Sequence, residues 1–231
     1  MAEYKTILFD IDDTLLDFEK DQKIAFMEAM NVIDCKCTEE MYLDYNLINL
    51  EMWEMLNEGK VTLQELFIKR FELFFEKYGI NQDEREFNEI LTKAFQRTGT
   101  PIKGSKSALE QLKDECELVI TSNGPKEQQY YRLENAGFSK YFSKIFISEE
   151  LGCNKPNKEY FDIVFQNINN KEKSSILIVG DSISSDIIGG KNFGIDTCWY
   201  NARNKQNKTN IEPNYEIKDF IELLKIIGGI K

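Results

Sequence analysis

Short apolar runs alternate with helical patterns along most of the chain. The apolar runs, each ended by small or polar residues, are ILF (7–9), LVIT (118–121), KIFIS (144–148), ILIVG (176–180) and TCWY (197–200). Segments with helical spacing lie between the later runs, at residues 105–114, about 126–136, 157–168 and 184–193. Continuous apolar strands that are separated by helices are typical of a parallel sheet covered on both faces. The pattern therefore predicts an α/β core.

Residues 17–99 show a different pattern. They contain no convincing strand, and their apolar residues recur at helical spacing in four successive groups. The groups are Ala25, Phe26, Ala29, Met30 and Ile33; Leu43, Leu47, Leu50 and Trp53; Leu63, Phe67, Phe71, Phe74 and Tyr78; and Phe87, Ile90, Leu91, Ala94 and Phe95. We interpret this region as an inserted all-helical domain, with the aromatic stripe as its own core rather than a cofactor site. The α/β core is then discontinuous, formed by residues 1–16 and 100–231.

Polar and acidic residues follow the predicted strands at four places. These are Asp10-Ile11-Asp12-Asp13-Thr14 after ILF, Ser122-Asn123-Gly124-Pro125 after LVIT, Asn154-Lys155-Pro156 after KIFIS, and Asp181 with Asp186 after ILIVG. Each alone has a local explanation as a turn, a helix start or a surface lysine. Parallel sheets, however, bind ligands beyond the carboxyl ends of their strands. We therefore predict one site at that edge, directly where the helical insertion leaves the first strand.

The residue types at this edge favour a metal ion and a phosphate group. Carboxylates at Asp10 and Asp181 would repel one another if the fold brings them together, and each would raise the pKa of the other. Mg²⁺ relieves such repulsion and prefers oxygen ligands. Lys155 adds positive charge, and the Ser122 hydroxyl with backbone amides at the next helix start would complete a phosphate cradle.

The overall charge argues against two classes of partner. The formal net charge is -11 and the sequence pI is about 4.8, so we expect neither a nucleic-acid polymer nor an anionic membrane as partner. No apolar run is long enough to span a bilayer, and the start MAEYKTILFDID does not resemble a signal peptide. Nothing in the sequence implies a protein partner. The phosphate cradle described above instead indicates a small molecule that carries a phosphate group.

Cysteine and histidine usage narrows the chemistry. The chain has 5 cysteines, an odd number, and we expect a reducing, cytoplasmic location. Cys35 and Cys37 lack a partner pair for a metal and are interpreted as surface thiols. Because the chain has no histidine, Ser-His-Asp, Cys-His and His-based zinc catalysis are excluded.

The four motifs together resemble those of the haloacid dehalogenase superfamily. The pattern is DxDxT, a hydroxyl residue at a strand end, Lys-Pro, and GDSxxxD; here it is Asp10 to Thr14, Ser122, Lys155-Pro156, and Gly180-Asp181-Ser182 with Asp186. The match covers the whole chain, and the helical insertion is similar to that family's C1 cap. The resemblance implies a Rossmann-like core with a cap at residues 17–99.

The resemblance also implies a mechanism with an aspartyl-phosphate intermediate. Asp10 is the expected nucleophile, and Asp12 the expected acid and base. Mg²⁺ would be held by the carboxylates of Asp10 and Asp181 and by the Asp12 backbone carbonyl, with Asp186 supporting the metal's water shell or Lys155.

Three residues are expected to hold the phosphoryl oxygens: Lys155, Ser122 and Asn123, the last through its amide. An acid at Asp12 favours a phosphatase over a dehalogenase, because a leaving halide needs no proton.

Further stretches resemble the bacterial pyrimidine 5'-nucleotidase subfamily. They are Asp17-Phe18, Trp53 with Glu58-Gly59-Lys60, Arg70-Phe71, Lys155-Pro-x-x-Glu159-Tyr160-Phe161 and Thr197-Cys-Trp-Tyr-Asn201. The resemblance implies hydrolysis of nucleoside monophosphates such as dUMP, UMP and dTMP. Trp53 and Arg70 would contact the substrate; a packed indole and a surface ion pair are the alternatives.

Other functions fit parts of the sequence. A phosphatase of another small phosphomonoester and a sugar phosphomutase share this chemistry. A phosphate-receiving switch has a similar set of residues, but its phosphoacceptor sits on a later strand and it lacks a large helical insertion. An inactive binding protein of the same fold would be expected to have lost motif residues, and none is missing here.

Overall fold

The computed structural model describes residues 4–57 and 59–228, so Glu58 of the nucleotidase-like stretch lies outside the described residues. The chain divides into two compact units, residues 1–18 with 99–231, and residues 19–98. We call the first the sheet unit and the second the helical unit. Within the described residues, no helix combines the length and apolar character that crossing a membrane requires.

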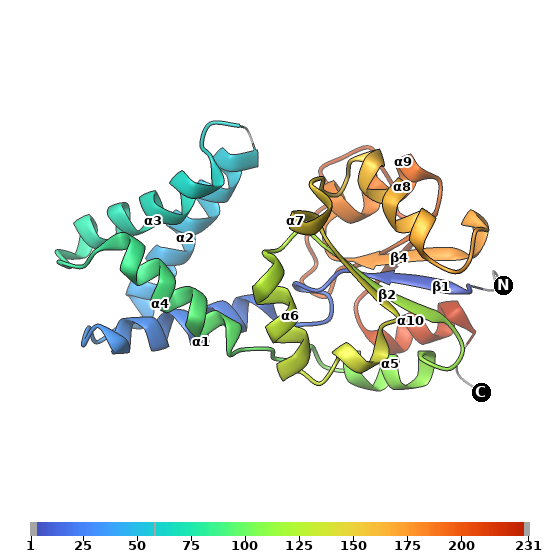
Figure 1. The fold of residues 1–231 in the computed structure, drawn as a ribbon, viewed down its shortest axis with the longest axis horizontal. Coiled ribbons are helices and arrows are strands. Elements are labelled where there is room, and N and C mark those ends of the chain that lie inside the picture. Colours follow the sequence, from blue (N-terminus) through green and yellow to red (C-terminus); the bar gives the residue numbers. More distant parts are fainter. Residues whose placement is uncertain (1–3, 58, 229–231) are drawn as a thin grey trace. The chain divides into compact units, whose positions relative to one another are not determined.

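The sheet unit is built on one parallel sheet (Figure 1). The strands are β1 (Thr6–Phe9), β2 (Glu117–Ser122), β3 (Lys144–Ile147), β4 (Ile176–Gly180), β5 (Asp196–Tyr200) and β6 (Tyr215–Ile217). Their order is β3-β2-β1-β4-β5-β6, and each described neighbouring pair is parallel. The α/β prediction is confirmed, although the sequence pattern did not reveal β6.

Helices cover both faces of this sheet, as Figure 1 shows for α5 and α10 on one side and α8 and α9 on the other. The helices are α5 (Ser105–Leu112), α6 (Lys126–Asn135), α7 (Ser148–Leu151), α8 (Lys158–Asn167), α9 (Ile188–Phe193) and α10 (Phe220–Ile227). Alternate strand residues point to opposite faces, so Ile7 and Phe9 pack with α5, α6 and α10, whereas Leu8 packs with α8 and α9.

Two adjacent glycines let α9 lie close to its neighbours. A Cβ on Gly189 would lie 2.4 Å from the ring of Phe161, and one on Gly190 would lie 2.7 Å from Ile178 and from Thr197. Neither distance is possible for a real side chain. The glycine pair is explained by close packing of the helix.

The helical unit consists of α1 (Phe18–Val32), whose first residue belongs to the sheet unit, α2 (Glu39–Asn57), α3 (Leu63–Tyr78) and α4 (Glu84–Gln96). Aromatic rings form its centre, as the sequence predicts. The ring of Phe26 stacks on Tyr45 at 4.0 Å between centroids, and Phe71, Phe74 and Phe87 are fully buried around them.

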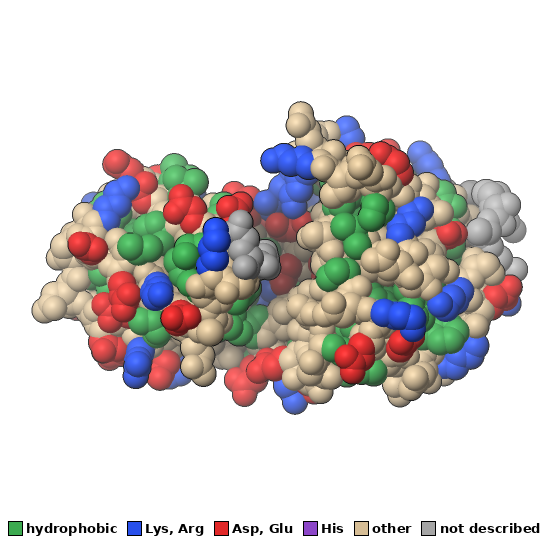
Figure 2. Space-filling view, turned by 90° about the horizontal axis from the view of Figure 1, so that it is seen from above, with side chains coloured by type: hydrophobic (Ala, Val, Ile, Leu, Met, Phe, Trp, Pro, Cys, Tyr) green, Lys and Arg blue, Asp and Glu red, His purple; other side chains and the backbone are tan. Residues whose placement is uncertain are grey.

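The spacing of apolar residues on α2 was misleading. Leu43, Leu47 and Leu50 recur like a buried face, yet each is more than half exposed. The buried face of α2 instead carries Tyr45 and other residues, namely Met41, Tyr42, Asn49 and Met52. Hydrophobic side chains also reach the surface of the helical unit between charged ones in the space-filling view (left in Figure 2). Tyr42 and Tyr45 are buried because their rings pack against Phe26 in the aromatic cluster.

Candidate active site

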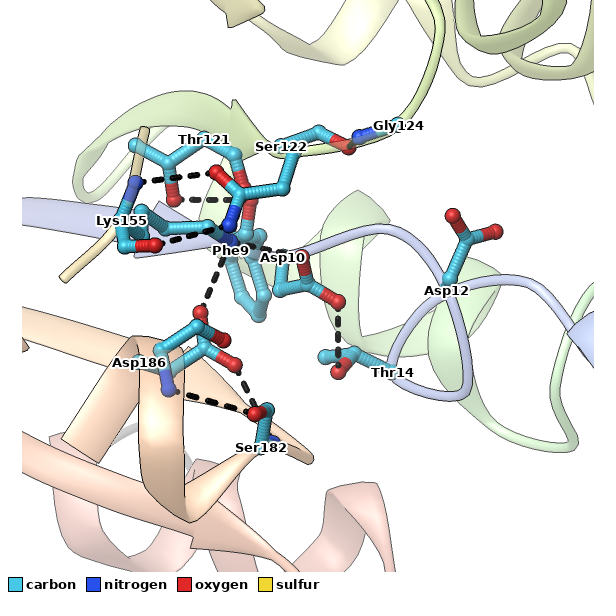
Figure 3. Close-up of polar contacts among 12 residues, drawn as sticks. Phe9, Asp10, Asp12, Thr14, Thr121, Ser122, Gly124, Lys155, Ser182 and Asp186 are labelled. Atoms are coloured by element: carbon cyan, nitrogen blue, oxygen red, sulfur yellow. Dashed lines mark hydrogen bonds and ion pairs between the residues drawn. The ribbon is translucent and has the colours of Figure 1, made fainter. Parts of the chain in front are cut away.

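The order of the strands collects the predicted residues at one edge of the sheet. β1 lies between β2 and β4, so Asp10 after β1, Ser122 at the end of β2 and Asp181 after β4 are on adjacent strands. Neighbouring strands lie about 4.8 Å apart. Lys155 reaches this edge from the loop between α7 and α8, and Figure 3 shows it pointing toward Asp10 and Asp186.

Lys155 is the centre of this cluster. Its ammonium donates to the Asp10 carboxylate at 2.7 Å, to the Asp186 carboxylate at 2.8 Å and to the backbone carbonyl of Thr121 at 2.7 Å. An ammonium group has three donors, and all three have an acceptor here. The residue is 2% exposed. The two carboxylates raise the pKa of Lys155 despite its burial, so it carries its charge.

The carboxylates near Asp10 carry more negative charge than the single ammonium of Lys155 balances. Its second carboxylate oxygen accepts a hydrogen bond from Thr14 at 3.3 Å. Burial raises the pKa of Asp10 well above its usual range, Lys155 opposes this rise, and the charges of Asp186 and Asp181 add to it. An additional cation would therefore stabilise the ionised form of Asp10.

Asp181 and Asp186 complete a group of three acids. One carboxylate oxygen from each of Asp10, Asp181 and Asp186 lies within 4.8 Å of the other two. Burial raises the pKa of Asp181 to about 6, while the ammonium of Lys205, 2.6 Å from it, acts in the opposite direction. Three hard oxygen donors with a surplus of negative charge fit Mg²⁺.

Asp186 is fixed by the backbone around it. It lies in a π-helical turn, Ile183–Ile187, and accepts a hydrogen bond from the amide of Ser182 at 3.1 Å. A Cβ on Gly180 would lie 2.3 Å from the Asp186 carboxyl carbon, so only glycine fits there. The motif's glycine therefore makes room for its last aspartate.

Ser122 and Asn123 have different surroundings. The Ser122 oxygen accepts hydrogen bonds from the Gly124 amide at 3.1 Å and from Gln129 at 3.0 Å, which leaves its own hydroxyl proton to donate. The Asn123 side chain bonds the backbone of Lys155 in both directions, at 2.9 and 3.0 Å. Asn123 thus fixes the loop that carries the lysine.

The Asp12 side chain stands apart from Asp10 on the loop after β1 (Figure 3), and residues of α6 hold it. Gln129 donates to one carboxylate oxygen at 2.6 Å, and Arg132 pairs with the other. The sequence interpretation did not find Gln129 or Arg132. The sequence gives one indication of them: Gln129 and Arg132 are three residues apart on a predicted helix, on the face that also carries the buried Leu133.

The contacts of Asp13 stabilise the turn after β1. Its backbone is left-handed, with φ of 56°, and its carboxylate accepts a hydrogen bond from the amide of Phe18 and pairs with Arg203. Arg203 and Lys205 lie on the loop after β5, and with Asp13 and Asp181 they help line a cavity of about 160 Å³. The sequence interpretation did not predict these two cations.

Trp53 and Arg70 belong to the helical unit. Trp53 is partly buried against Met52, Val61 and Leu66. Arg70 is 7% exposed and donates to Asn49 at 2.9 Å and Asn88 at 2.8 Å. The alternative of a surface ion pair is therefore wrong for Arg70. Substrate contacts by either residue stay a prediction.

A comparison of the sequence with models of protein families finds a match that spans the four motifs. The model of haloacid dehalogenase-like hydrolases matches residues 7–200. The chain belongs to this family. The resemblance that the motifs suggested is confirmed, and this hydrolase has relatives of similar length.

Three of these relatives cover nearly the whole chain. The HAD-hydrolase YfnB of Bacillus subtilis is 36% identical over 99% of this chain and 97% of its own. Its magnesium-bound crystal structure, which reveals interdomain movement, has a TM-score of 0.93 over 97% of this chain and 99% of the relative. The pyrimidine 5'-nucleotidase YjjG of Escherichia coli is 33% identical over 96% of both chains. The pyrimidine 5'-nucleotidase PynA of Streptococcus pneumoniae is 32% identical over 96% of this chain and 94% of its own.

Proposed function

We propose that this hydrolase is a Mg²⁺-dependent phosphatase of nucleoside 5'-monophosphates, with dUMP, UMP and dTMP as the first candidates. The observation that carries the phosphatase proposal is a second carboxylate, Asp12, which lies two residues after Asp10 in the chain and has its own partners, Gln129 and Arg132. A phosphate ester needs both a nucleophile and a proton for its leaving oxygen. The two pyrimidine nucleotidase relatives support the choice of substrate.

In the first step, a carboxylate oxygen of Asp10 forms a bond to phosphorus while the bond from phosphorus to the leaving oxygen breaks. Asp12 gives its proton to that oxygen. In the second step, water attacks the phosphorus of phospho-Asp10, Asp12 takes a proton from the water, and Asp10 is released with inorganic phosphate.

Lys155 would keep Asp10 ionised and oriented for attack in the first step, and would stabilise its carboxylate as the bond to phosphorus breaks in the second. Because its three donors are already used, its positive charge acts mainly through the nucleophile, 2.7 Å away. The hydroxyl proton of Ser122 would donate directly to a phosphoryl oxygen, because the Ser122 oxygen accepts its hydrogen bonds from Gly124 and Gln129.

Asp10, Asp181 and Asp186 would hold the Mg²⁺ ion through the oxygens that face one another. When bound, the ion would neutralise charge on the phosphoryl group as the transition state forms.

The test is phosphate release from dUMP, UMP, dTMP and a set of sugar phosphates, with Mg²⁺ and with EDTA. We expect release from the pyrimidine nucleotides with Mg²⁺ and none with EDTA. Asp114→Asn, which removes an exposed carboxylate before β2, is the matched control for acid substitutions and should keep full activity. Activity that survives full chelation would contradict the metal's role. Release from sugar phosphates alone would contradict the nucleotidase proposal.

A further inference from the structure

Helix α6 holds both carboxylate oxygens of Asp12. The Gln129 side-chain amide donates to Oδ2 at 2.6 Å, and an Arg132 guanidinium nitrogen pairs with Oδ1. The two donors lie within the protein: Gln129 is 1% exposed and Arg132 is fully buried. With a donor on each oxygen, the carboxylate plane of Asp12 can rotate only by breaking one of these contacts.

The surroundings fix the orientation of Gln129. Its amide nitrogen has two hydrogens, of which one goes to Asp12 and the other to the Ser122 hydroxyl oxygen at 3.0 Å. Its amide oxygen accepts from Arg132 at 3.1 Å. The reversed amide would turn its oxygen toward a carboxylate and its nitrogen toward a guanidinium, so only one orientation is compatible with these neighbours.

The backbone near Ser122 leaves space for this side chain. A Cβ on Gly124 would lie 2.0 Å from the Gln129 amide nitrogen. Any other residue at position 124 would thus displace the amide from Asp12 and Ser122. The position of the Gln129 amide therefore depends on glycine at position 124.

Burying an arginine is costly, and an apolar residue of similar volume would often stabilise a fold as well or better. The geometry points to a functional use instead. We propose that Gln129 and Arg132 are positioning residues: they hold the Asp12 carboxylate in the orientation for proton transfer, and Gln129 couples that orientation to the Ser122 hydroxyl. This inference rests on the proposed function, since it assumes that Asp12 transfers the proton.

The test uses the dependence of rate on the leaving group. Gln129→Leu keeps the volume but removes the hydrogen bonds to Asp12 and Ser122. Its kcat/KM, which reports the steps up to expulsion of the leaving group, should fall about 10- to 100-fold for phenyl phosphate, whose leaving oxygen needs a proton. It should fall much less for 2,4-dinitrophenyl phosphate, whose leaving group departs as an anion. Gln128→Leu, a neighbour on the same helix, is the matched control and should match the wild-type protein on both substrates.

A double-mutant cycle tests whether Gln129 acts through Asp12. On phenyl phosphate, Gln129→Leu should cause no further loss of kcat/KM in an Asp12→Asn background, because the carboxylate that transfers the proton is already absent. Arg132→Lys is a second variant that keeps the positive charge. We expect Arg132→Lys to show the same dependence on the leaving group, to a smaller extent. Circular dichroism and thermal melting check that each variant is folded.

Three outcomes are distinguishable. An equal loss on both aryl phosphates would mean that Gln129 has only a structural role, and the inference would be overturned. A crystal structure of Gln129→Leu in which the Asp12 carboxylate keeps its orientation would overturn it as well. If the wild-type protein hydrolyses no phosphate ester, the proposed function fails instead, and the crystal structure of the variant still decides whether Gln129 positions Asp12.

Discussion

At the scale of single residues, the charge balance around Lys155 determines what the site can do. One ammonium faces two carboxylates at hydrogen-bond distance, with a third nearby. Buried ions need partners, and removal of one partner leaves an uncompensated charge. The arrangement that we propose to keep the nucleophile ionised therefore also contributes to the stability of the fold.

Lys155→Met should lower the free energy of unfolding by about 3–5 kcal/mol, because Asp10 and Asp186 would lose their buried counterion. Urea unfolding followed by circular dichroism measures this. Adding Asp186→Asn should recover part of the loss. Lys158→Met, at a lysine that is 72% exposed, is the control and should show almost no change. A Lys155 variant as stable as the wild-type protein would contradict the described ion pairs.

The sequence predicted some of these residues and not others, for a physical reason. Asp10, Lys155 and Asp186 stand in short motifs, each following a predicted apolar run, and their charged side chains made them candidates for a site. Gln129 and Arg132 lie on a helix whose other residues are mostly polar, so periodicity does not distinguish them from solvent-facing positions. Only the packing of α6 against the sheet identifies the face on which they lie.

At the scale of elements, α2 shows the limit of periodicity. Two sets of residues on this helix have the spacing of a buried face, and the set of leucines is exposed while Tyr45 is buried. Periodicity identifies a helix, but it does not choose between two faces when both carry large side chains. Contact with the rings of Phe26 and Phe71 decides the choice.

Tyr45→Ala should therefore lower the free energy of unfolding by about 3–5 kcal/mol, as expected when a large buried ring is removed. Leu47→Gln should change it by less than about 0.5 kcal/mol, because Leu47 is 59% exposed. Chemical denaturation of both variants measures the two values. Equal losses would show that the leucine face is buried in solution.

Helix α3 begins with a capping box that can be tested alone. The Thr62 hydroxyl accepts from the Glu65 amide at 3.2 Å, and the Glu65 carboxylate accepts from the Thr62 amide at 2.8 Å. Thr62→Ala should destabilise the protein by about 1 kcal/mol, whereas Thr62→Ser should retain most of the stability. Thermal melting distinguishes the two; an alanine variant that melts with the wild-type protein would contradict the cap.

The loop after β5 adds a prediction about metal affinity. Lys205 pairs with Asp181, a proposed Mg²⁺ ligand, and its ammonium would compete with the ion for that carboxylate. Lys205→Met should bind Mg²⁺ more tightly, by up to about fivefold, since a half-exposed pair contributes at most ~1 kcal/mol. Isothermal titration calorimetry at fixed pH measures this. Lys208→Met, an exposed lysine on the same loop, is the control. Weaker binding by the Lys205 variant would mean that the lysine supports the site.

At the scale of the whole molecule, the topology explains how residues far apart in the sequence meet at one edge of the sheet. Because β1 lies between β2 and β4, the carboxyl ends of these strands bring Asp10, Ser122 and Asp181 together, and Lys155 contacts Asp10 there. The alternation of strands and helices predicted the parallel sheet because β1 to β5 each contain a mostly apolar run, whereas β6 is short and was missed. It could not give the strand order, since that depends on how the helices pack on each face.

The central claim is that Asp10 is phosphorylated during turnover. Peptide mapping by mass spectrometry of the enzyme, acid-quenched during turnover of dUMP with Mg²⁺, tests it most directly. We predict a phosphoryl group on Asp10, with none in the Asp10→Asn variant and no phosphate release by that variant. A phosphoryl group on another residue, or phosphate release by Asp10→Asn, would contradict the mechanism.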